Sequence, residues 1–445
     1  MYVLTGNIRS IYFRYLLATF GSACIPCIYN LVDMAIVGQY YGSDGTAALS
    51  VVMPLFSIIY SLGILTGIGG SVLYSTEKGK QSQEDPNAYF TVSVICTALL
   101  SVLAWILLFT VEEPLLRFFG ADDDLITLAM EYMAPIRIAI PLFIFNQMLA
   151  TYLRNDNAPI CATVAVVISG ACNVLGDLLF VFGLDMGMLG AGIATAIGAL
   201  ISMCIMLLHF HSKKNTLHFT KISHFWQKAG RIALTGFPSF FVDLALGIVT
   251  VLFNRQIMQY LGTDALSVFG VLTNLNTFVQ CCAYSVGDAS QPLLSANFGA
   301  KQWNRVIESL RYAVWTVIGF GIIWTGLILL FPNGFIHLFM DATEDVLEIA
   351  PRIMRIYSLS FLFMPFNVFS TLYFQSIMHA TTAFVVSVGR GLVLSGLCIL
   401  LLPQIFSADA IWWSMPITEF VTAIYAGIMM FYYTKQIRLK ENLKN

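Results

Sequence analysis

Long apolar segments separated by short polar breaks constrain this chain more than any other feature of its sequence. A bilayer core of about 30 Å requires about 20 apolar residues per crossing helix, and twelve segments meet that requirement. Their approximate ranges are 12–37, 48–74, 89–111, 125–152, 159–182, 188–209, 230–258, 266–290, 309–331, 346–374, 382–403 and 410–433. Backbone polar groups in lipid must be satisfied within each segment, which favours helices. The sequence therefore predicts an all-α polytopic membrane protein.

The composition excludes several soluble classes of protein. Of the 445 residues, 58% are apolar and only 11% are charged, whereas soluble domains average about 45–50% apolar and about 25% charged residues. So few charges cannot cover an ordinary cytosolic enzyme, and the apolar content excludes a disordered chain. The net charge of -2 offers no basic face for nucleic acid. We expect membrane lipids around a monomer, no nucleic-acid partner and no cofactor.

The charges also predict how the chain is oriented. If the N-terminus lies inside, the cytoplasmic loops and ends carry most of the 23 basic residues, and acidic residues collect on the opposite side. This asymmetry follows the positive-inside rule. We therefore expect a multi-pass protein of the inner, or cell, membrane with both termini in the cytoplasm.

A weak internal repeat indicates that the chain has two related halves. Gln39–Gly42 returns as Gln259–Gly262 at an offset of 220 residues, and Phe145–Asn146 returns as Phe366–Asn367 at an offset of 221. Chance similarity in a biased composition is the alternative. Two halves of six spans would share one orientation, related by an axis along the membrane normal, and substrate would sit between them.

The longest polar break lies halfway along the chain. It covers residues 210–229 and interrupts the apolar pattern between the sixth and seventh segments. We therefore expect an N-terminal six-helix lobe over 1–209, a cytoplasmic linker over 210–229 and a C-terminal six-helix lobe over 230–445.

Ionisable residues inside the predicted spans are candidate functional residues, because a charge at mid-bilayer is costly without a cavity or a partner. Those candidates are Asp33, Asp177, Asp243, Asp288, Arg390 and Glu419.

Oxygen-bearing side chains in the first half indicate an ion site. Asn173 and Asp177 are four residues apart and share one helix face, while Asp33 lies in the first span and Thr195 in the sixth. Hard cations prefer such oxygen ligands, and buried carboxylates can instead carry a proton. A packing hydrogen bond between helices remains an open alternative for Asn173 and Asp177.

The second half offers weaker candidates. Asp243 lies in the seventh span, which is the repeat mate of the first, and Glu419 follows a proline in the last span. Asp288 lies near the end of the eighth span, where it could reach the interface. We expect Arg390 to extend its guanidinium to the inner interface.

Four motifs resemble those of the multidrug and toxic compound extrusion (MATE) transporters. Their residues are Tyr29–Gly38 (YNLVDMAIVG), Gly236–Ser239 (GFPS), Gln291–Ala300 (QPLLSANFGA) and Pro416–Glu419 (PITE). The motifs are spread over nearly the whole chain. The resemblance implies a V-shaped pair of six-helix bundles related by pseudo-two-fold symmetry. It also implies antiport by alternating access, in which cationic or amphipathic organic compounds leave while Na+ or H+ enters.

The chain is similar in particular to the DinF-like branch of that family. The branch implies an ion site within the N-terminal lobe, formed by Asp33, Asn173, Asp177, Thr195 and the backbone carbonyl of Ala191. One departure concerns the first span. Branch members usually carry an early proline where this chain has an alanine at position 18, with a proline only at position 26. That difference leaves open how the first helix would bend.

Other functions fit the sequence less well. A flippase for lipid-linked or polysaccharide precursors would keep the fold, but it would need several basic residues in its cavity, and the spans hold few. An intramembrane enzyme would need a catalytic motif such as H-E-x-x-H, which is missing from the sequence. A passive channel would need a pore ring or a repeated filter, and neither is found.

Overall fold

The computed structural model describes residues 2–80, 85–339 and 343–442. Across these residues all regular secondary structure is helical, without a β-strand. Twelve of the described helical segments are long and apolar enough to cross a membrane. The predicted all-α class and the predicted number of spans are thereby confirmed.

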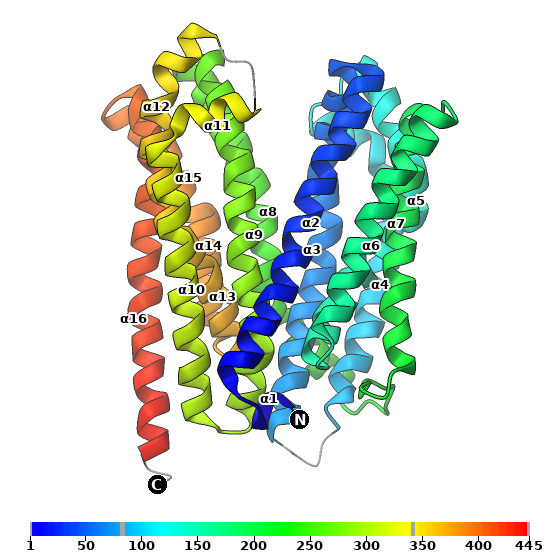
Figure 1. Cartoon of the computed structure of the whole chain (residues 1–445), viewed down its shortest axis with the longest axis vertical. Coiled ribbons are helices and arrows are strands. Elements are labelled where there is room, and N and C mark those ends of the chain that lie inside the picture. Colours follow the sequence, from blue (N-terminus) through cyan, green and yellow to red (C-terminus); the bar gives the residue numbers. More distant parts are fainter. Residues whose placement is uncertain (1, 81–84, 340–342, 443–445) are drawn as a thin grey trace. The chain divides into compact units, whose positions relative to one another are not determined.

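The first half of the chain runs from α1 to η2 (Figure 1). Its elements are α1 (Tyr2–Thr5), α2 (Ile8–Tyr41), α3 (Ser43–Lys80), α4 (Asn87–Phe118), α5 (Asp123–Asn155), α6 (Pro159–Asp177), the π-helix η1 (Leu178–Gly183), α7 (Gly187–Leu207) and the 3-10 helix η2 (Leu208–His211).

The second half runs from α8 to α16 and contains more breaks. Its elements are α8 (Phe225–Tyr260), α9 (Thr263–Gly299), α10 (Trp303–Leu330), α11 (Pro332–Phe339), α12 (Glu344–Ser358), the 3-10 helix η3 (Leu359–Leu362), α13 (Met364–Ser376), α14 (Ala380–Val388), the π-helix η4 (Gly389–Val393), α15 (Leu394–Ile405), the 3-10 helix η5 (Ala408–Trp413) and α16 (Ser414–Asn442).

The tenth span is less regular than the sequence suggested. We expected one helix over 346–374, but the segment consists of α12, the 3-10 turn η3 and α13. Pro365 occupies the first turn of α13. Proline has no N–H to give to the preceding turn, so it suits the first turn of a new helix and the continuous helix is interrupted before it.

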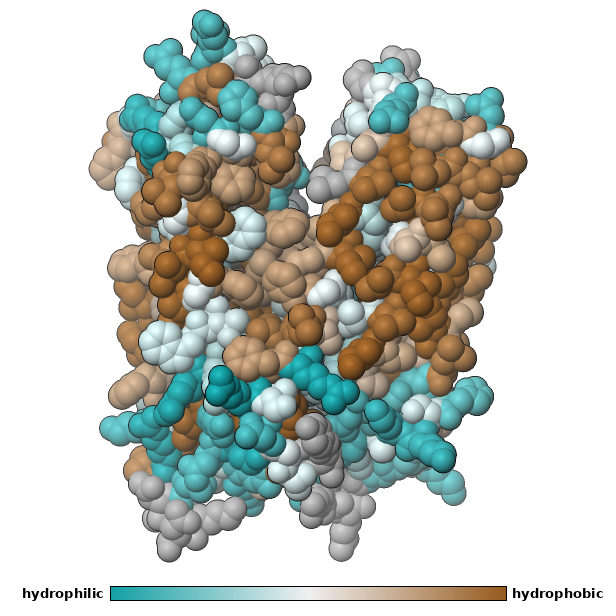
Figure 2. All heavy atoms as spheres, viewed as in Figure 1, coloured by the Kyte–Doolittle hydropathy of each residue, from teal (hydrophilic) through white to brown (hydrophobic). Residues whose placement is uncertain are grey.

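Apolar side chains form a separate core in each of two compact units. The first unit is Leu17–Phe240, and the second unit is Val3–Leu16 together with Phe241–Asn445. On the visible face, apolar residues cover the middle of the helices in each unit and hydrophilic residues gather at the helix ends (Figure 2). Such a band is typical of helices that face lipid.

The first turns of α2 belong to the second unit. Tyr12 donates a hydrogen bond through its hydroxyl to Thr316 Oγ1 at 2.9 Å. The guanidinium of Arg305 donates to the backbone carbonyls of Val3 and Gly6, at 2.9 and 2.8 Å. The packing units therefore divide within α2 and α8, whereas the lobe boundaries read from the sequence, 1–209 and 230–445, stay a prediction.

Backbone conformation repeats between the two halves of the chain. Gly42 and Gly262, 220 residues apart, both have positive φ (69° and 83°) and follow the first long helix of each half. Asn157 and Met378, 221 residues apart, also have positive φ (62° and 65°). Residues with a β-carbon rarely adopt this conformation, so its return at the same offset supports the internal repeat.

A hydrogen bond repeats at the same offset. Asn146 donates through Nδ2 to the carbonyl of Ala199 at 2.8 Å, and Asn367 donates in the same way to the carbonyl of Glu419 at 2.8 Å. Each bond ties together the fourth and sixth spans of its own half. Asn146 and Asn367 belong to the repeated Phe-Asn pair, so the sequence match reflects a shared packing contact.

Candidate functional site

Three helices of the first unit meet at Asp33. This residue lies on α2 with 3% of its surface exposed. Tyr132 of α5 donates through its hydroxyl to Asp33 Oδ2 at 3.2 Å, and the same hydroxyl lies 3.3 Å from Thr195 Oγ1 of α7. Both distances are longer than the usual O–H···O distance of about 2.8 Å. The contacts around Asp33 are therefore loose.

Helix α6 adds the amide and the second carboxyl group. Asn173 donates through Nδ2 to Thr195 Oγ1 at 3.1 Å, and the side chain of Asp177 is fully buried and close enough to that of Asp33 to interact with it. Ala191 is buried one turn before Thr195 on α7. The structure therefore gathers Asp33, Asn173, Asp177 and Thr195 in one place.

Apart from the contact between the two carboxyl groups themselves, four oxygen atoms of this cluster receive no hydrogen bond from a donor group in the described part of the chain. They are Asp33 Oδ1, Asn173 Oδ1 and both carboxyl oxygens of Asp177. A buried charge without a partner is unstable, and two neighbouring carboxyl groups repel each other when both are ionised. A proton or a hard cation would relieve both problems. The arrangement is chemically suited to binding either one.

Small residues let α6 and α7 approach closely enough to form this cluster. A β-carbon added at Gly176 would lie 2.9 Å from the β-carbon of Ala194, and one added at Gly190 would lie 2.9 Å from the backbone of Phe180. Immediately after Asp177 the α-helix changes to the π-helix η1. Such π segments are often found at functional sites.

The second unit buries an ion pair. Arg390 of η4 donates through Nε to Glu419 Oε1 of α16 at 2.6 Å, and Asn367 of α13 donates to Glu419 Oε2 at 2.6 Å. Glu419 has no exposed surface and Arg390 has 9%. The expectation that Arg390 extends to the interface is therefore wrong. A buried carboxylate gives the guanidinium a partner inside the unit, so it need not reach water.

Two further sequence candidates, Asp288 and Asp243, lie on α9 and α8. Asp288 is half-buried on α9 and has interactions of its own. Asp243 belongs to α8 by its backbone, but its side chain lies outside the described residues.

The MatE family model matches residues 18–179 and 238–400, which is more than half of the chain. The chain belongs to the MatE family. The predicted family and its fold of twelve membrane helices are confirmed, and the chain is a multi-pass membrane protein. Membership of the DinF-like branch stays a prediction.

Relatives and solved structures of MatE transporters match over most of this chain. "Multidrug export protein MepA" of Staphylococcus saprophyticus is 21% identical over 411 residues, covering 92% of this chain and 90% of the relative. "Probable multidrug resistance protein YoeA" of Bacillus subtilis is 24% identical over 351 residues, covering 77% and 75%. An outward-facing multidrug resistance MATE family transporter superposes with a TM-score of 0.90 at 19% identity, covering 98% of each chain.

Sequence reasoning missed Tyr132 in this MatE protein. It is neutral and lies on the fourth span, so it was not counted among the ionisable residues. A buried tyrosine usually finds a partner for its hydroxyl. That rule could have marked Tyr132 as polar, but it could not have selected Asp33, which is 99 residues away, as the partner.

A second polar cluster of the first unit, which we name the Asp156 clasp, fastens the linker segment around Thr216 to the ends of α3, α5 and η2. Asp156 follows α5, and its carboxylate binds Lys78 Nζ at 3.1 Å, His209 Nε2 at 2.9 Å and the backbone N–H of Thr216 at 2.9 Å. Burial alone would raise the pKa of Asp156. The hydrogen bond from His209, the charge of Lys78 and the bonds from Thr216 outweigh burial and hold the pKa below its usual value.

Proposed function

We propose that this chain is a secondary active multidrug exporter that exchanges cationic or amphipathic organic compounds for Na+ or H+ by alternating access. The observation that carries the proposal is the group of buried oxygen atoms without donors at Asp33, Asn173 and Asp177. The names of the relatives MepA and YoeA supply the direction of transport and the drug-like cargo.

In this mechanism the coupling ion neutralises the paired carboxyl groups. A proton or Na+ held between Asp33 and Asp177 would draw α2 and α6 together, whereas the empty pair would repel. Thr195 Oγ1, Asn173 Oδ1 and the carbonyl of Ala191 would complete the shell of a bound Na+, and a proton would need only the carboxyl groups. Both ions therefore remain candidates.

Coupling follows if drug and ion favour different conformations. Each ligand can shift the equilibrium only by the difference between its affinities for the two states. Ion entering from outside would favour the state that releases drug, and drug entering from inside would favour the other. We place the protein as a monomer in the inner membrane with both termini in the cytoplasm, and we propose no enzymatic activity.

The flippase alternative receives less support. A cavity for a diphosphate-linked lipid would present several cationic groups, whereas the buried cluster of the second unit holds a single arginine whose charge Glu419 balances. The relatives named above are described as multidrug exporters or resistance proteins.

Transport by purified protein in liposomes tests the proposal. We would impose a Na+ gradient or a pH gradient, one at a time, and follow the export of a fluorescent organic cation. Asp33→Asn and Asp177→Asn should each reduce gradient-driven export at least tenfold. The matched control is Asp123→Asn, because Asp123 is a solvent-exposed acid of the same unit. Wild-type rates in both site variants would sink the ion-site assignment, and no export under either gradient would sink the exporter.

A further inference from the structure

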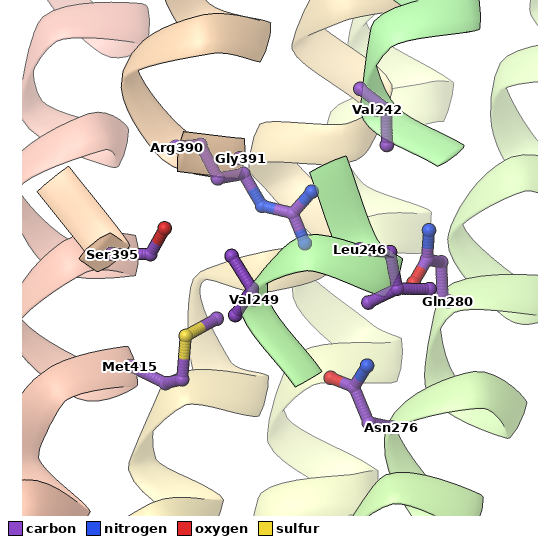
Figure 3. Close-up of a pocket in the computed structure, with 9 residues that line it drawn as sticks. All are labelled: Val242, Leu246, Val249, Asn276, Gln280, Arg390, Gly391, Ser395 and Met415. Atoms are coloured by element: carbon purple, nitrogen blue, oxygen red, sulfur yellow. The ribbon is translucent and has the colours of Figure 1, made fainter. Parts of the chain in front are cut away.

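The second unit contains a pocket beside the buried ion pair. Its volume is about 30 Å³. Polar side chains line it from two sides, with Asn276 and Gln280 on α9 and with Arg390 and Ser395 on η4 and α15 (Figure 3). Apolar side chains of α8 and Met415 complete the wall. All of these residues belong to the second unit.

Arg390 has hydrogen-bonding capacity to spare in this pocket. A guanidinium carries five N–H groups, only one of them on Nε. Glu419 accepts a hydrogen bond from that Nε. Among the described residues, no other acceptor for Arg390 is found. Figure 3 shows the two terminal nitrogens directed into the pocket, toward the side where Leu246 lies. The end of the guanidinium, which suits two parallel hydrogen bonds, therefore faces the pocket.

A second buried donor faces the same space. Ser395 has no exposed surface, and its hydroxyl has no hydrogen-bond partner in the part of the chain that the structure describes. Buried hydroxyl groups are nearly always partnered. Asn276, which is itself 9% exposed, adds an amide on the opposite wall. The polar wall is thus rich in donors, and each of its four polar residues has at most 9% of its surface exposed.

We infer that this pocket binds the carboxylate group of a transported organic molecule. The volume holds about two water molecules, which matches the two oxygens of a carboxylate and is small for the four of a phosphate. The end of a guanidinium binds a carboxylate through two parallel hydrogen bonds. Val242, Leu246 and Met415 would contact the apolar part of the same molecule. The inference rests on the proposed transport function and adds to it a site for an acidic group.

Charge balance favours a zwitterion over a simple anion. Arg390 and Glu419 together are neutral, so a bare carboxylate would add a net negative charge within the membrane span, which is costly. A ligand that carries its own positive centre keeps the total charge at zero. The preferred substrates therefore bear a carboxylate and a cationic group on one apolar body.

Binding to the full-length protein tests the inference. The probes are a fluorescent xanthene dye with a free benzoate group, which is zwitterionic, and the methyl ester of the same dye, which is cationic. Wild-type protein should bind the acid roughly tenfold to a hundredfold more tightly than the ester, because each hydrogen bond to a charged group contributes appreciably.

Three variants separate recognition from folding. Arg390→Lys keeps the charge but loses the planar fork, so the ratio of acid affinity to ester affinity should fall at least tenfold. Arg390→Met combined with Glu419→Gln removes both charges together and should abolish the preference. Ser395→Ala should reduce it about threefold. The matched control is Ser376→Ala, since Ser376 is buried in the same unit and donates to the carbonyl of Leu372 in its own helix.

Each outcome separates this inference from the proposed function. Equal binding of acid and ester by wild type, or an unchanged preference in the double variant, would overturn the carboxylate site. If liposomes export the ester without any Arg390-dependent preference for the acid, the exporter function is supported and the carboxylate site is overturned. If binding of the acid depends on Arg390 while neither dye is exported, the carboxylate site is supported and the exporter function is overturned.

Discussion

The hydroxyl of Tyr132 donates to Asp33 Oδ2 at 3.2 Å, and it is the donor group that reaches the Asp33–Asp177 pair among the described residues. Tyr132 also lies between Asp33 and Thr195, which accepts from Asn173. If Thr195 donates to Tyr132, the hydrogen bonds run in one direction from Asn173 to Asp33, and such chains strengthen one another. A substitution at Tyr132 should therefore change the environment of the carboxyl pair while both carboxyl groups stay in place.

Tyr132→Phe removes the donor and keeps the ring. Asp33 then loses the hydrogen bond that competes with the coupling ion, so the ion should bind more tightly and leave more slowly. We expect the half-saturating ion concentration to fall roughly threefold to tenfold, because one hydrogen bond to a charged group is lost, and export to slow. Steady-state export against ion concentration measures both quantities. Tyr432→Phe, at an exposed position, is the control, and a weaker apparent ion affinity would contradict the argument.

Asp177→Asn should stabilise the protein while it removes coupling. The substitution replaces a buried carboxyl group that has no donor by a neutral group of the same shape, and it ends the repulsion with Asp33. We expect the ion-free protein to gain about 1–2 kcal/mol, a size common for stabilising changes at strained functional sites. Thermal unfolding in buffer without Na+ measures the gain. A lower melting temperature for the variant would mean that the carboxyl pair is already satisfied in the ion-free state.

The sequence anticipates the first-half site because helical periodicity carries most of its geometry. Asn173 and Asp177 had to share a face of α6, and the burial of Asp33 followed from its place in an apolar span. The number of spans followed from their length in the same way. The family resemblance supplied the meeting of α2, α6 and α7, since no spacing within one chain shows which helices pack together; the contribution of Tyr132 from α5 was not foreseen.

The ion pair of the second unit could not be predicted by considering its members one at a time. Arg390 and Glu419 lie 29 residues apart on different helices. Each alone is costly in a membrane, so a single arginine is expected to reach the interface. The packing of η4 against α16 brings the two side chains together, so that each reduces the free-energy cost of burying the other. The Asp156 clasp was missed for a related reason, because the linker holding Thr216 was treated as a spacer between lobes.

Removing one member of the buried ion pair should cost more than removing both charges. Arg390→Met leaves Glu419 buried with Asn367 as its remaining side-chain donor, and breaking such a pair costs about 3–5 kcal/mol. Adding Glu419→Gln removes the unpaired charge and should restore most of that stability. Thermal unfolding of the wild type and both variants provides the comparison. A double variant as unstable as Arg390→Met would show that the loss comes from packing around the arginine side chain.

Acid should loosen the Asp156 clasp. Its interactions hold the pKa of Asp156 below its usual value, so the native state binds this proton less readily than the unfolded chain does. The clasp therefore contributes its full stability above the unfolded pKa of about 4 and loses it as the pH falls through the native pKa. Asp156→Asn should cost about 3 kcal/mol at pH 7, because Lys78 and His209 lose their buried partner.

The pH dependence distinguishes the clasp from general acid sensitivity. Stability of wild type and Asp156→Asn, measured by thermal unfolding from pH 7 down to about pH 3, should converge as Asp156 becomes protonated in the native state. Asp123→Asn supplies the control, because its exposed pair with Arg117 contributes little, and its curve should run parallel to that of wild type. A constant gap between wild type and Asp156→Asn across the whole range would mean that Asp156 stabilises the linker by its shape and not by its charge.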